Sequence, residues 1–166
     1  MSAEISRVGI LMGSASDWSI MKAAHDLLDH FGVAHEVRVL SAHRTPDESA
    51  RYARDAIGRG LEVIIAGAGG AAHLAGVLAA HTTLPIIGVP VENGPLKGFD
   101  ALLATVQMPP GIPVATVGIN GSLNAGLLAV QIMAGADKLL RERLESYRES
   151  MQAKVATMNE RIQSEL

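Results

Sequence analysis

The sequence contains no cysteine, and this absence excludes several kinds of chemistry. Disulfides, zinc–thiolate sites, iron–sulfur clusters and thiol nucleophiles all need that side chain. Aromatic residues are scarce, with two Phe, two Tyr and one Trp, so platforms on which nucleic-acid bases could stack are lacking. The formal net charge is -3, and no cluster of Lys and Arg provides a basic surface for phosphate backbones. We therefore expect no nucleic-acid partner.

Two stretches without charged residues, 63–80 and 111–136, are long enough to suggest membrane spans. Glycines and turn residues interrupt both, and neither has the aromatic or basic flanks of a spanning helix. The first seven residues include Glu4 and lack the pattern of a secretory leader. We therefore expect no membrane association and a cytoplasmic location.

The length of 166 residues fits one domain, and the abundance of glycine and small aliphatic residues is typical of parallel α/β proteins. Apolar runs of strand length alternate with helical patterns, as in repeated βα units. The pattern predicts strands near 7–13, 34–40, 62–67, 85–90 and 113–119, and helices near 17–31, 46–59, 71–82, 98–106 and 122–135. We expect a single domain over 1–166, whose core at 7–135 is a three-layer α/β/α sandwich with a parallel, flavodoxin-like sheet of order 2-1-3-4-5.

The ends of the first two helices have clear signals. The first helix places apolar residues on one face, namely Met21, Ala24, Leu28 and Phe31. Gly32 closes it. For the second helix we expect Thr45 as the N-cap, Pro46 at the first position, a capping box completed by Glu48, and Gly60 beyond the end.

Several helices have surfaces that one sandwich cannot cover. The helices near 71–82 and 122–135 contain no charged residue, so neither has a face suited to water. A long C-terminal helix over 138–164 carries an apolar seam: Leu140, Leu144, Tyr147, Met151, Val155, Met158 and Ile162. One two-fold contact buries only one patch per subunit. The sequence therefore predicts a homo-oligomer larger than a dimer, with 138–164 as an oligomerisation helix.

Polar residues follow the first predicted strand, where a parallel sheet binds its ligands. The turn Gly13-Ser14-Ala15-Ser16-Asp17-Trp18 opens a helix, and its serine hydroxyls and free amides suit a phosphate. Asp17 would repel a phosphate, so it suits a ribose diol as a hydrogen-bond acceptor. The alternative is that Ser16 or Asp17 only caps the helix.

A second polar turn, Ser41-Ala42-His43-Arg44-Thr45-Pro46, follows the second strand. The planar guanidinium of Arg44 suits phosphate oxygens, and histidine exchanges a proton near neutral pH. The alternative is a polar loop that only caps the next helix.

The third turn contains Gly67-Ala68-Gly69-Gly70-Ala71-Ala72-His73-Leu74. It satisfies G-x-G-x-x-A, and Glu92 lies 20 residues beyond Ala72, as in a dinucleotide fingerprint. That motif normally follows the first strand, so we favour a turn stripped of side chains, against which a flat ligand can lie. The alternative for His73 is a core histidine without a chemical role.

The remaining histidines have the character of surface or interface residues: His25, His30, His35 and His81. We assign them no role. The three turns also lack a carboxylate and histidine cluster at metal-ligand spacing, so no metal site is expected there.

Taken together, the three turns resemble the class I PurE family. Two further segments share the resemblance, Gly88-Val89-Pro90-Val91 and Val106-Gln107-Met108-Pro109, and the matches run in order over 7–135. The resemblance implies a mutase that moves a carboxyl group from the exocyclic nitrogen of N5-carboxyaminoimidazole ribonucleotide to C4 of the imidazole. It implies no metal or redox cofactor, and it sharpens the expected assembly to a homo-octamer.

The resemblance also implies roles for individual residues. His43 would protonate the departing nitrogen, free carbon dioxide and later remove the C4 proton, and His73 would share the catalytic site. Phosphate and ribose would bind Ser14, Ser16, Asp17, Ser41 and Arg44. The base, the carboxylate and the transient carbon dioxide would be enclosed by Gly70, Ala71, His73 and Leu74.

The chain departs from the family pattern at Ala75, at the loop around 92–95 and at Pro110, none of which is a proposed catalytic group. Three other readings remain open. A class II relative would carboxylate aminoimidazole ribonucleotide directly, but in that class the sequence of the third turn resembles A-G-R-S-N. The others are a non-catalytic nucleotide sensor on the same scaffold and a PurE-like domain of a cofactor-carboxylating synthase.

Overall fold

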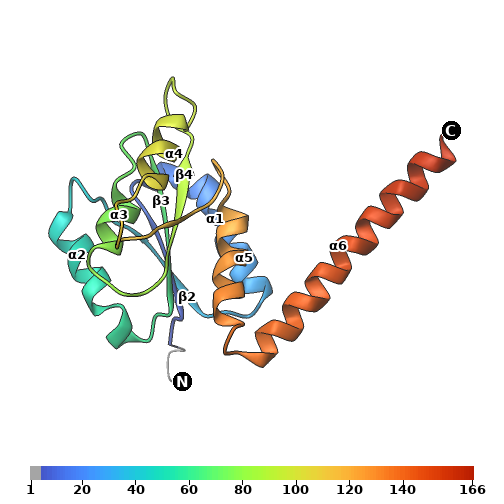
Figure 1. Ribbon diagram of the computed structural model, residues 1–166, viewed down its shortest axis with the longest axis horizontal. Helices are drawn as coiled ribbons and strands as arrows, with labels where there is room; N and C mark the ends of the chain where they lie inside the picture. Colours follow the sequence, from blue (N-terminus) through green and yellow to red (C-terminus); the bar gives the residue numbers. More distant parts are fainter. Residues whose placement is uncertain (1–4) are drawn as a thin grey trace. The chain divides into compact units, whose positions relative to one another are not determined.

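The computed structural model describes residues 5–166, which form two compact units that divide after Ala129. The first unit contains one parallel sheet (Figure 1). Its strands are β1 (Val8–Met12), β2 (His35–Val39), β3 (Val63–Gly69), β4 (Ile86–Val91) and β5 (Ala115–Thr116). Their order is β2-β1-β3-β4-β5. The predicted topology is therefore confirmed, although β5 has only two residues.

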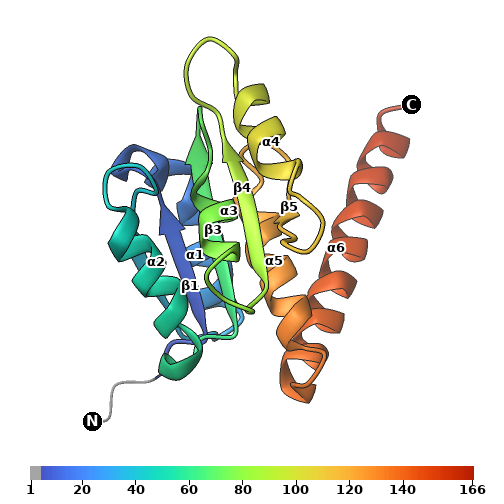
Figure 2. The same cartoon turned by 60° about the vertical axis from the view of Figure 1, so that its left-hand side comes forward.

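Helices connect the strands and cover both faces of the sheet. They are η1 (Ala15–Asp17), α1 (Trp18–His30), α2 (Pro46–Asp55), η2 (Ile57–Arg59), α3 (Leu74–Ala79), α4 (Phe99–Val106) and α5 (Ser122–Met133). Figure 1 shows α2 and α3 on one face and α1 on the other, which confirms the three layers. Figure 2 shows β3 and β4 side by side, with α4 next to β4.

The central strands are buried on both faces. Every residue of β1 and β4 is buried, and their sequences VGILM and IIGVPV lack polar residues. Such continuous apolar runs are typical of parallel strands covered by helices on both sides. Edge strand β2, HEVRV, is partly buried or exposed along its length. Gly9 in β1 leaves room for the Tyr52 ring, whose hydroxyl donates to Glu36 Oε1 at 2.6 Å.

The first helix ends as its sequence predicts. The four residues of its predicted apolar face are at most 1% exposed: Met21, Ala24, Leu28 and Phe31. Gly32 follows with a φ of 64°, a conformation that glycine adopts without steric cost.

The predicted capping box at the start of α2 is wrong. Thr45 is the N-cap residue and Pro46 follows it, but the Thr45 side chain makes no capping bond. Its hydroxyl instead accepts from the Ser41 backbone N–H at 3.0 Å and donates to the Ser41 carbonyl at 3.1 Å. The hydroxyl therefore closes the second turn on itself.

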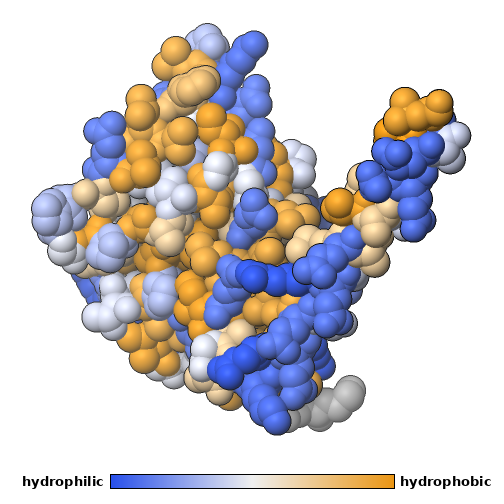
Figure 3. Space-filling model, turned by 45° about the vertical axis from the view of Figure 1, so that its right-hand side comes forward, coloured by the Kyte–Doolittle hydropathy of each residue, from blue (hydrophilic) through white to orange (hydrophobic). Residues whose placement is uncertain are grey.

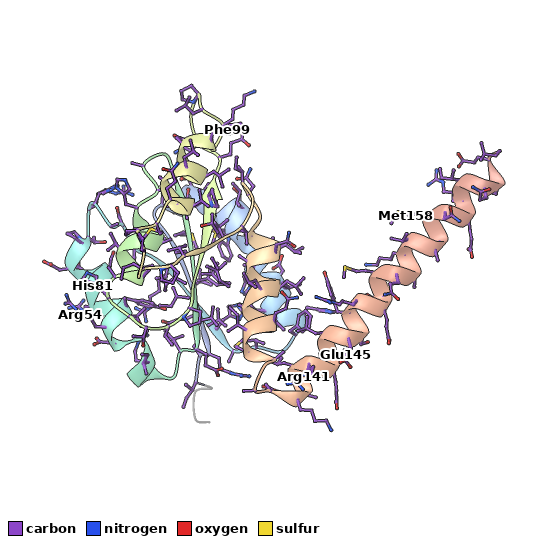
Figure 4. All side chains as sticks on the ribbon, viewed as in Figure 1. Arg54, His81, Phe99, Arg141, Glu145 and Met158 are labelled. Carbon is purple, nitrogen blue, oxygen red and sulfur yellow. The ribbon has the colours of Figure 1, made fainter. Side chains whose placement is uncertain are left out.

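Helices α3 and α4 of the first unit differ in how much apolar surface they expose. The helix expected over 71–82 is α3, which spans only Leu74–Ala79 and buries three apolar side chains, Leu74, Ala75 and Leu78. By contrast, α4 exposes Phe99, Leu103 and Val106 by 64%, 53% and 51%. Figure 4 labels Phe99 on this helix. The argument from charge therefore named α3, which the single chain largely covers, and α5, which exposes Leu123 and Ile132 by 45% and 38%. It missed α4, whose only charged residue is Asp100.

The second unit contains the end of α5 and the long helix α6 (Lys138–Ser164), which has the predicted bounds. The Asp137 side chain caps α6 by accepting from the Leu140 N–H at 3.2 Å. Arg141, labelled in Figure 4, donates to the carbonyls of Ala134 and Gly135 and so fixes the turn before the helix. Figure 3 shows a mostly hydrophilic surface along α6, with apolar atoms near its C-terminal end.

The far part of the predicted seam on α6 is exposed. Exposed fractions are 39% for Met151, 63% for Val155, 60% for Met158 and 53% for Ile162. Across residues 5–166, no helix is both long enough and apolar enough to cross a membrane.

Candidate active site

A cleft of about 420 Å³ lies where β1, β2 and β3 end. The turns after these strands supply most of its lining: Gly13, Ser14, Ser16, Asp17, Ser41, Ala42, His43, Arg44, Ala68, Gly69, Ala71, His73, Leu74 and Asn93. Every predicted site residue except Gly70 is in this set, and Gly70 lies between two members of it. The structure thus brings together predicted site residues that are up to 60 positions apart, Ser14 and Leu74.

The first turn is held by its own hydrogen bonds. Ser14 caps η1 by accepting from the Ser16 N–H at 3.3 Å, while its own N–H donates to Asp17 Oδ2 at 3.0 Å. The Ser16 hydroxyl donates to Ser14 Oγ at 2.9 Å. Capping by Asp17 was the alternative interpretation of this turn, and Asp17 does take part in the capping box. Because the turn also lines the cleft, capping and ligand binding are compatible here.

Asp17 is a buried carboxyl group in this turn, with 6% of the residue exposed. Burial raises the pKa of Asp17, because loss of water disfavours the charged form. Hydrogen bonds from the Ser14 N–H and the Ser16 hydroxyl, together with the positive charge of Arg44, offset part of this increase in pKa. A buried acceptor next to two hydroxyls is suited to a neutral hydroxylated ligand group rather than to an anion.

Arg44 connects the second turn to the first. Its Nη2 donates to the Gly13 carbonyl at 2.7 Å, and its Nε donates to the Ser41 hydroxyl at 3.3 Å. The Arg44 backbone N–H also donates to Ser41 Oγ at 3.2 Å. A guanidinium has five N–H donors, so this anchored side chain keeps donors for an anionic ligand in the cleft.

The second and third turns bring two imidazoles together. His43 Nε2 lies 2.7 Å from His73 Nδ1, and the ring centroids are 4.9 Å apart and nearly perpendicular. Only one of the two facing nitrogens can carry the proton of this hydrogen bond. Both residues are exposed at the cleft rather than packed in the core, which contradicts the alternative of a core histidine at position 73.

Glycines allow the third turn to lie close to its neighbours. A Cβ on Gly67 would overlap the Met21 side chain of α1, and one on Gly69 would lie 2.9 Å from Asn93 Cβ. Gly70 has a φ of 62° and nothing within 4 Å of an added Cβ, so its requirement is conformational. The turn leads into α3, whose first residue, Leu74, is 2% exposed.

Asn93 is the lining residue from the fourth strand's turn, and sequence reasoning missed it. It is part of the loop around 92–95, noted from the sequence only as a departure from the family pattern. Its position just after β4 was nevertheless a usable signal, because the rule applied to the first three strands covers the fourth as well.

The four histidines with no predicted role lie outside the cleft. His81 contacts Arg54 Nη2 through Nδ1 at 3.4 Å (Figure 4). His25 and His35 contact each other instead, and the His35 side chain is only 5% exposed. His35 was expected at a surface or an interface; its side chain is largely covered, because the turn after α1 carries its ring back against the helix.

The chemistry available in the cleft is proton transfer next to a bound polar ligand. Two histidines can hold and exchange a proton, Arg44 can bind an anion, and the Asp17 turn can accept from hydroxyls.

Comparisons with known proteins show which proteins the chain is similar to. A family model described as AIR carboxylase matches residues 7–154. The N5-carboxyaminoimidazole ribonucleotide mutase of Pyrococcus abyssi is 58% identical over 145 residues, which cover 87% of this chain and 83% of that protein. The mutase of Bacillus subtilis is 54% identical over 157 residues, covering 93% and 97%. The crystal structure of Treponema denticola PurE has a TM-score of 0.83 and 29% identity, with 93% and 96% covered.

Proposed function

The chain belongs to the AIR carboxylase family, and we propose that it acts as an N5-carboxyaminoimidazole ribonucleotide mutase in purine biosynthesis. The observation that carries the proposal is the His43 and His73 pair at the rim of a cleft that also holds an anchored arginine. Relatives more than half identical over most of this chain have the mutase name. This supports a mutase rather than a nucleotide sensor or a direct carboxylase.

His43 moves the proton in the proposed reaction. Protonated His43 donates its proton to the substrate's N5 as the bond from N5 to the carboxylate breaks, which leaves the amine and carbon dioxide. C4 of the electron-rich imidazole then forms a bond to the carbon of carbon dioxide. Neutral His43 removes the proton from C4, and the ring recovers its aromatic electrons. The proton count balances, so each turnover returns His43 to its starting form.

His73 is the hydrogen-bond partner of His43 in this scheme. With its Nδ1 2.7 Å from His43 Nε2, it can orient the reacting ring and stabilise its protonated form. Together with Gly70, Ala71 and Leu74, it encloses the base and holds carbon dioxide away from water.

The nucleotide binds across the first two turns in the proposed complex. Arg44, fixed by Gly13 and Ser41, takes the phosphate together with the serine hydroxyls of the first turn. Asp17 accepts from the ribose diol, because a buried carboxyl whose pKa burial raises is better suited to a hydroxyl donor than to contact with a phosphate.

We also propose that the enzyme is a cytoplasmic homo-octamer. Exposed apolar residues occur on α4 and α6 of the single chain, among them Phe99 and Val155. Two separate apolar surfaces per subunit support a closed assembly with more than one kind of contact.

The proposed reaction is tested by supplying the purified protein with N5-carboxyaminoimidazole ribonucleotide and no ATP. We expect the C4-carboxylated nucleotide to form without added bicarbonate. The matched control supplies aminoimidazole ribonucleotide with bicarbonate. Product formed only in the control would show that the protein is a direct carboxylase rather than a mutase. Nucleotide binding without product in either reaction would support a sensor.

A further inference from the structure

A second group of histidines lies outside the cleft, where α1 meets the first residue of β2. His25 Nδ1 is 2.6 Å from His35 Nε2, and Asp29 completes the group. Each of the three residues offers one ligand atom, and these three atoms all lie within 4.8 Å of one another. His35 begins β2, whereas the second turn of the cleft follows the end of that strand, so the two sites are at opposite ends of β2.

We propose that His25, Asp29 and His35 form a binding site for a divalent transition-metal ion of the zinc and nickel class. Two imidazoles and one carboxylate are ligands that such ions prefer, and three protein ligands leave a fourth position for water. His25 and Asp29 are four residues apart on α1, so they occupy the same face of the helix. Among residues 5–166, this is the one group of histidine and carboxylate side chains with metal-ligand proximity.

The buried histidine is already oriented as a ligand. His35 Nδ1 lies 2.8 Å from the Val33 carbonyl, which can only accept, so Nδ1 carries the proton. The lone pair is then on Nε2, the atom that faces His25. Histidine ligands commonly donate their other N–H to a backbone carbonyl, which fixes the ring and its tautomer. This His35 side chain is only 5% exposed, so little reorganisation is needed.

The spacing of the group fits an ion after a small adjustment. Metal–nitrogen bonds of about 2.0 Å place tetrahedral ligand atoms about 3.3 Å apart. His35 Nε2 and Asp29 Oδ1 are 3.9 Å apart, close to this spacing, and His25 presents its Nδ1 to the same His35 nitrogen. The contact of 3.4 Å to Asp29 Oδ2 is made by the other His25 nitrogen, Nε2, which is not the ligand atom. The close pair, His25 Nδ1 and His35 Nε2, shares the His25 proton. An ion between them requires this proton to move to His25 Nε2, on the side of Asp29, and the two nitrogens to separate by about 0.7 Å. His25 and Asp29, whose side chains are 32% and 62% exposed, can make that adjustment.

The only tryptophan of the chain reports on this site. The Trp18 ring centroid is 5.6 Å from that of His25. A paramagnetic ion bound to His25 therefore quenches Trp18 fluorescence at close range. The experiment titrates the untagged full-length protein with Ni²⁺ and follows that fluorescence. We expect saturable quenching with one ion per chain, and calorimetry with Zn²⁺ gives the same stoichiometry at this site.

Matched variants identify the ligands. Asp29→Asn and His25→Gln each lower the affinity for the ion by at least about tenfold, since even second-sphere partners contribute that much in metal sites. His30→Gln, on the same helix, leaves the affinity unchanged. His43→Asn also leaves it unchanged, which separates this site from the histidine pair of the cleft. Circular dichroism verifies that each variant is folded.

Three results would overturn the proposal. The first is the absence of saturable quenching up to about 1 mM Ni²⁺, which would leave only a hydrogen bond between two histidines. The second is an undiminished affinity in folded Asp29→Asn and His25→Gln. The third is the loss of quenching in His43→Asn, which would assign the ion to the cleft.

Discussion

The sharpest test of the proposed mechanism replaces His43 by asparagine. Asparagine can still donate a hydrogen bond toward His73 Nδ1, but it cannot carry a proton through the reaction. We expect turnover to fall at least about 10²-fold, the usual scale for a positioned acid–base group, which corresponds to about 2.7 kcal/mol in activation free energy. Because His43 is exposed, the free energy of unfolding should change by no more than about 0.5 kcal/mol.

The assay separates chemistry from binding and folding. Single-turnover conversion of N5-carboxyaminoimidazole ribonucleotide measures the chemical step, calorimetry measures nucleotide affinity, and urea titration measures stability. His81→Asn, which alters a histidine outside the cleft, is the matched control and should behave as wild type. Near-normal turnover in His43→Asn would refute the mechanism.

The partner histidine provides a second arm of the same test. His73→Asn should reduce turnover less than His43→Asn, because it removes the hydrogen-bond partner rather than the proton carrier. It should also displace the basic limb of the pH–rate profile, because the reaction starts from protonated His43, whereas a purely structural role would leave that limb in place. The reverse order of the two variants would assign proton transfer to His73.

Three further predictions concern binding, packing and assembly. Asp17→Ala should lower the nucleotide affinity, measured by calorimetry, more than it lowers the single-turnover rate, measured by rapid quench. An unchanged affinity with a collapsed rate would show that the first turn acts in the chemical step and not in binding. Gly88→Ala should lower the free energy of unfolding by about 1 to 3 kcal/mol in urea titration, because the new Cβ meets the branched side chain of Thr105. Gly58→Ala, with nothing within 4 Å of its Cβ, should be near neutral. Removing residues 138–166 should lower both the mass in light scattering and the activity, whereas a full-length chain that is fully active at 17.4 kDa would contradict assembly.

The strands were predictable because their composition reflects burial on both faces, and their order followed from the repeated βα pattern. The strand runs of β1, β3 and β4 are almost purely apolar and are separated by patterns with helical periodicity. The last strand was predicted as seven residues at 113–119, yet only Ala115 and Thr116 pair with β4. An apolar run indicates burial, but it does not show how many of its residues have a partner strand.

Local contacts explain where the details of the prediction failed. The hydroxyl of Thr45 had two possible partners, the helix N-terminus and the Ser41 backbone, and sequence spacing alone does not choose between them. The contact between His25 and His35 depends on the path of residues 31–34, which returns β2 alongside α1. Such a path is set by tertiary packing, so spacing along the chain did not reveal the pair.

The meeting of His43 and His73 follows from the sheet itself. β2 and β3 both pair with β1, and Met12 is level with Val39 on one side and with Gly67 on the other. Strands are about 4.8 Å apart, so the ends of β2 and β3 are about 10 Å apart across β1. Two imidazoles that extend toward each other from the following turns can close that gap, and here they do so at 2.7 Å. The order 2-1-3 therefore places two residues 30 positions apart above the end of β1, where the turn that contains Asp17 supplies the remaining wall of the cleft.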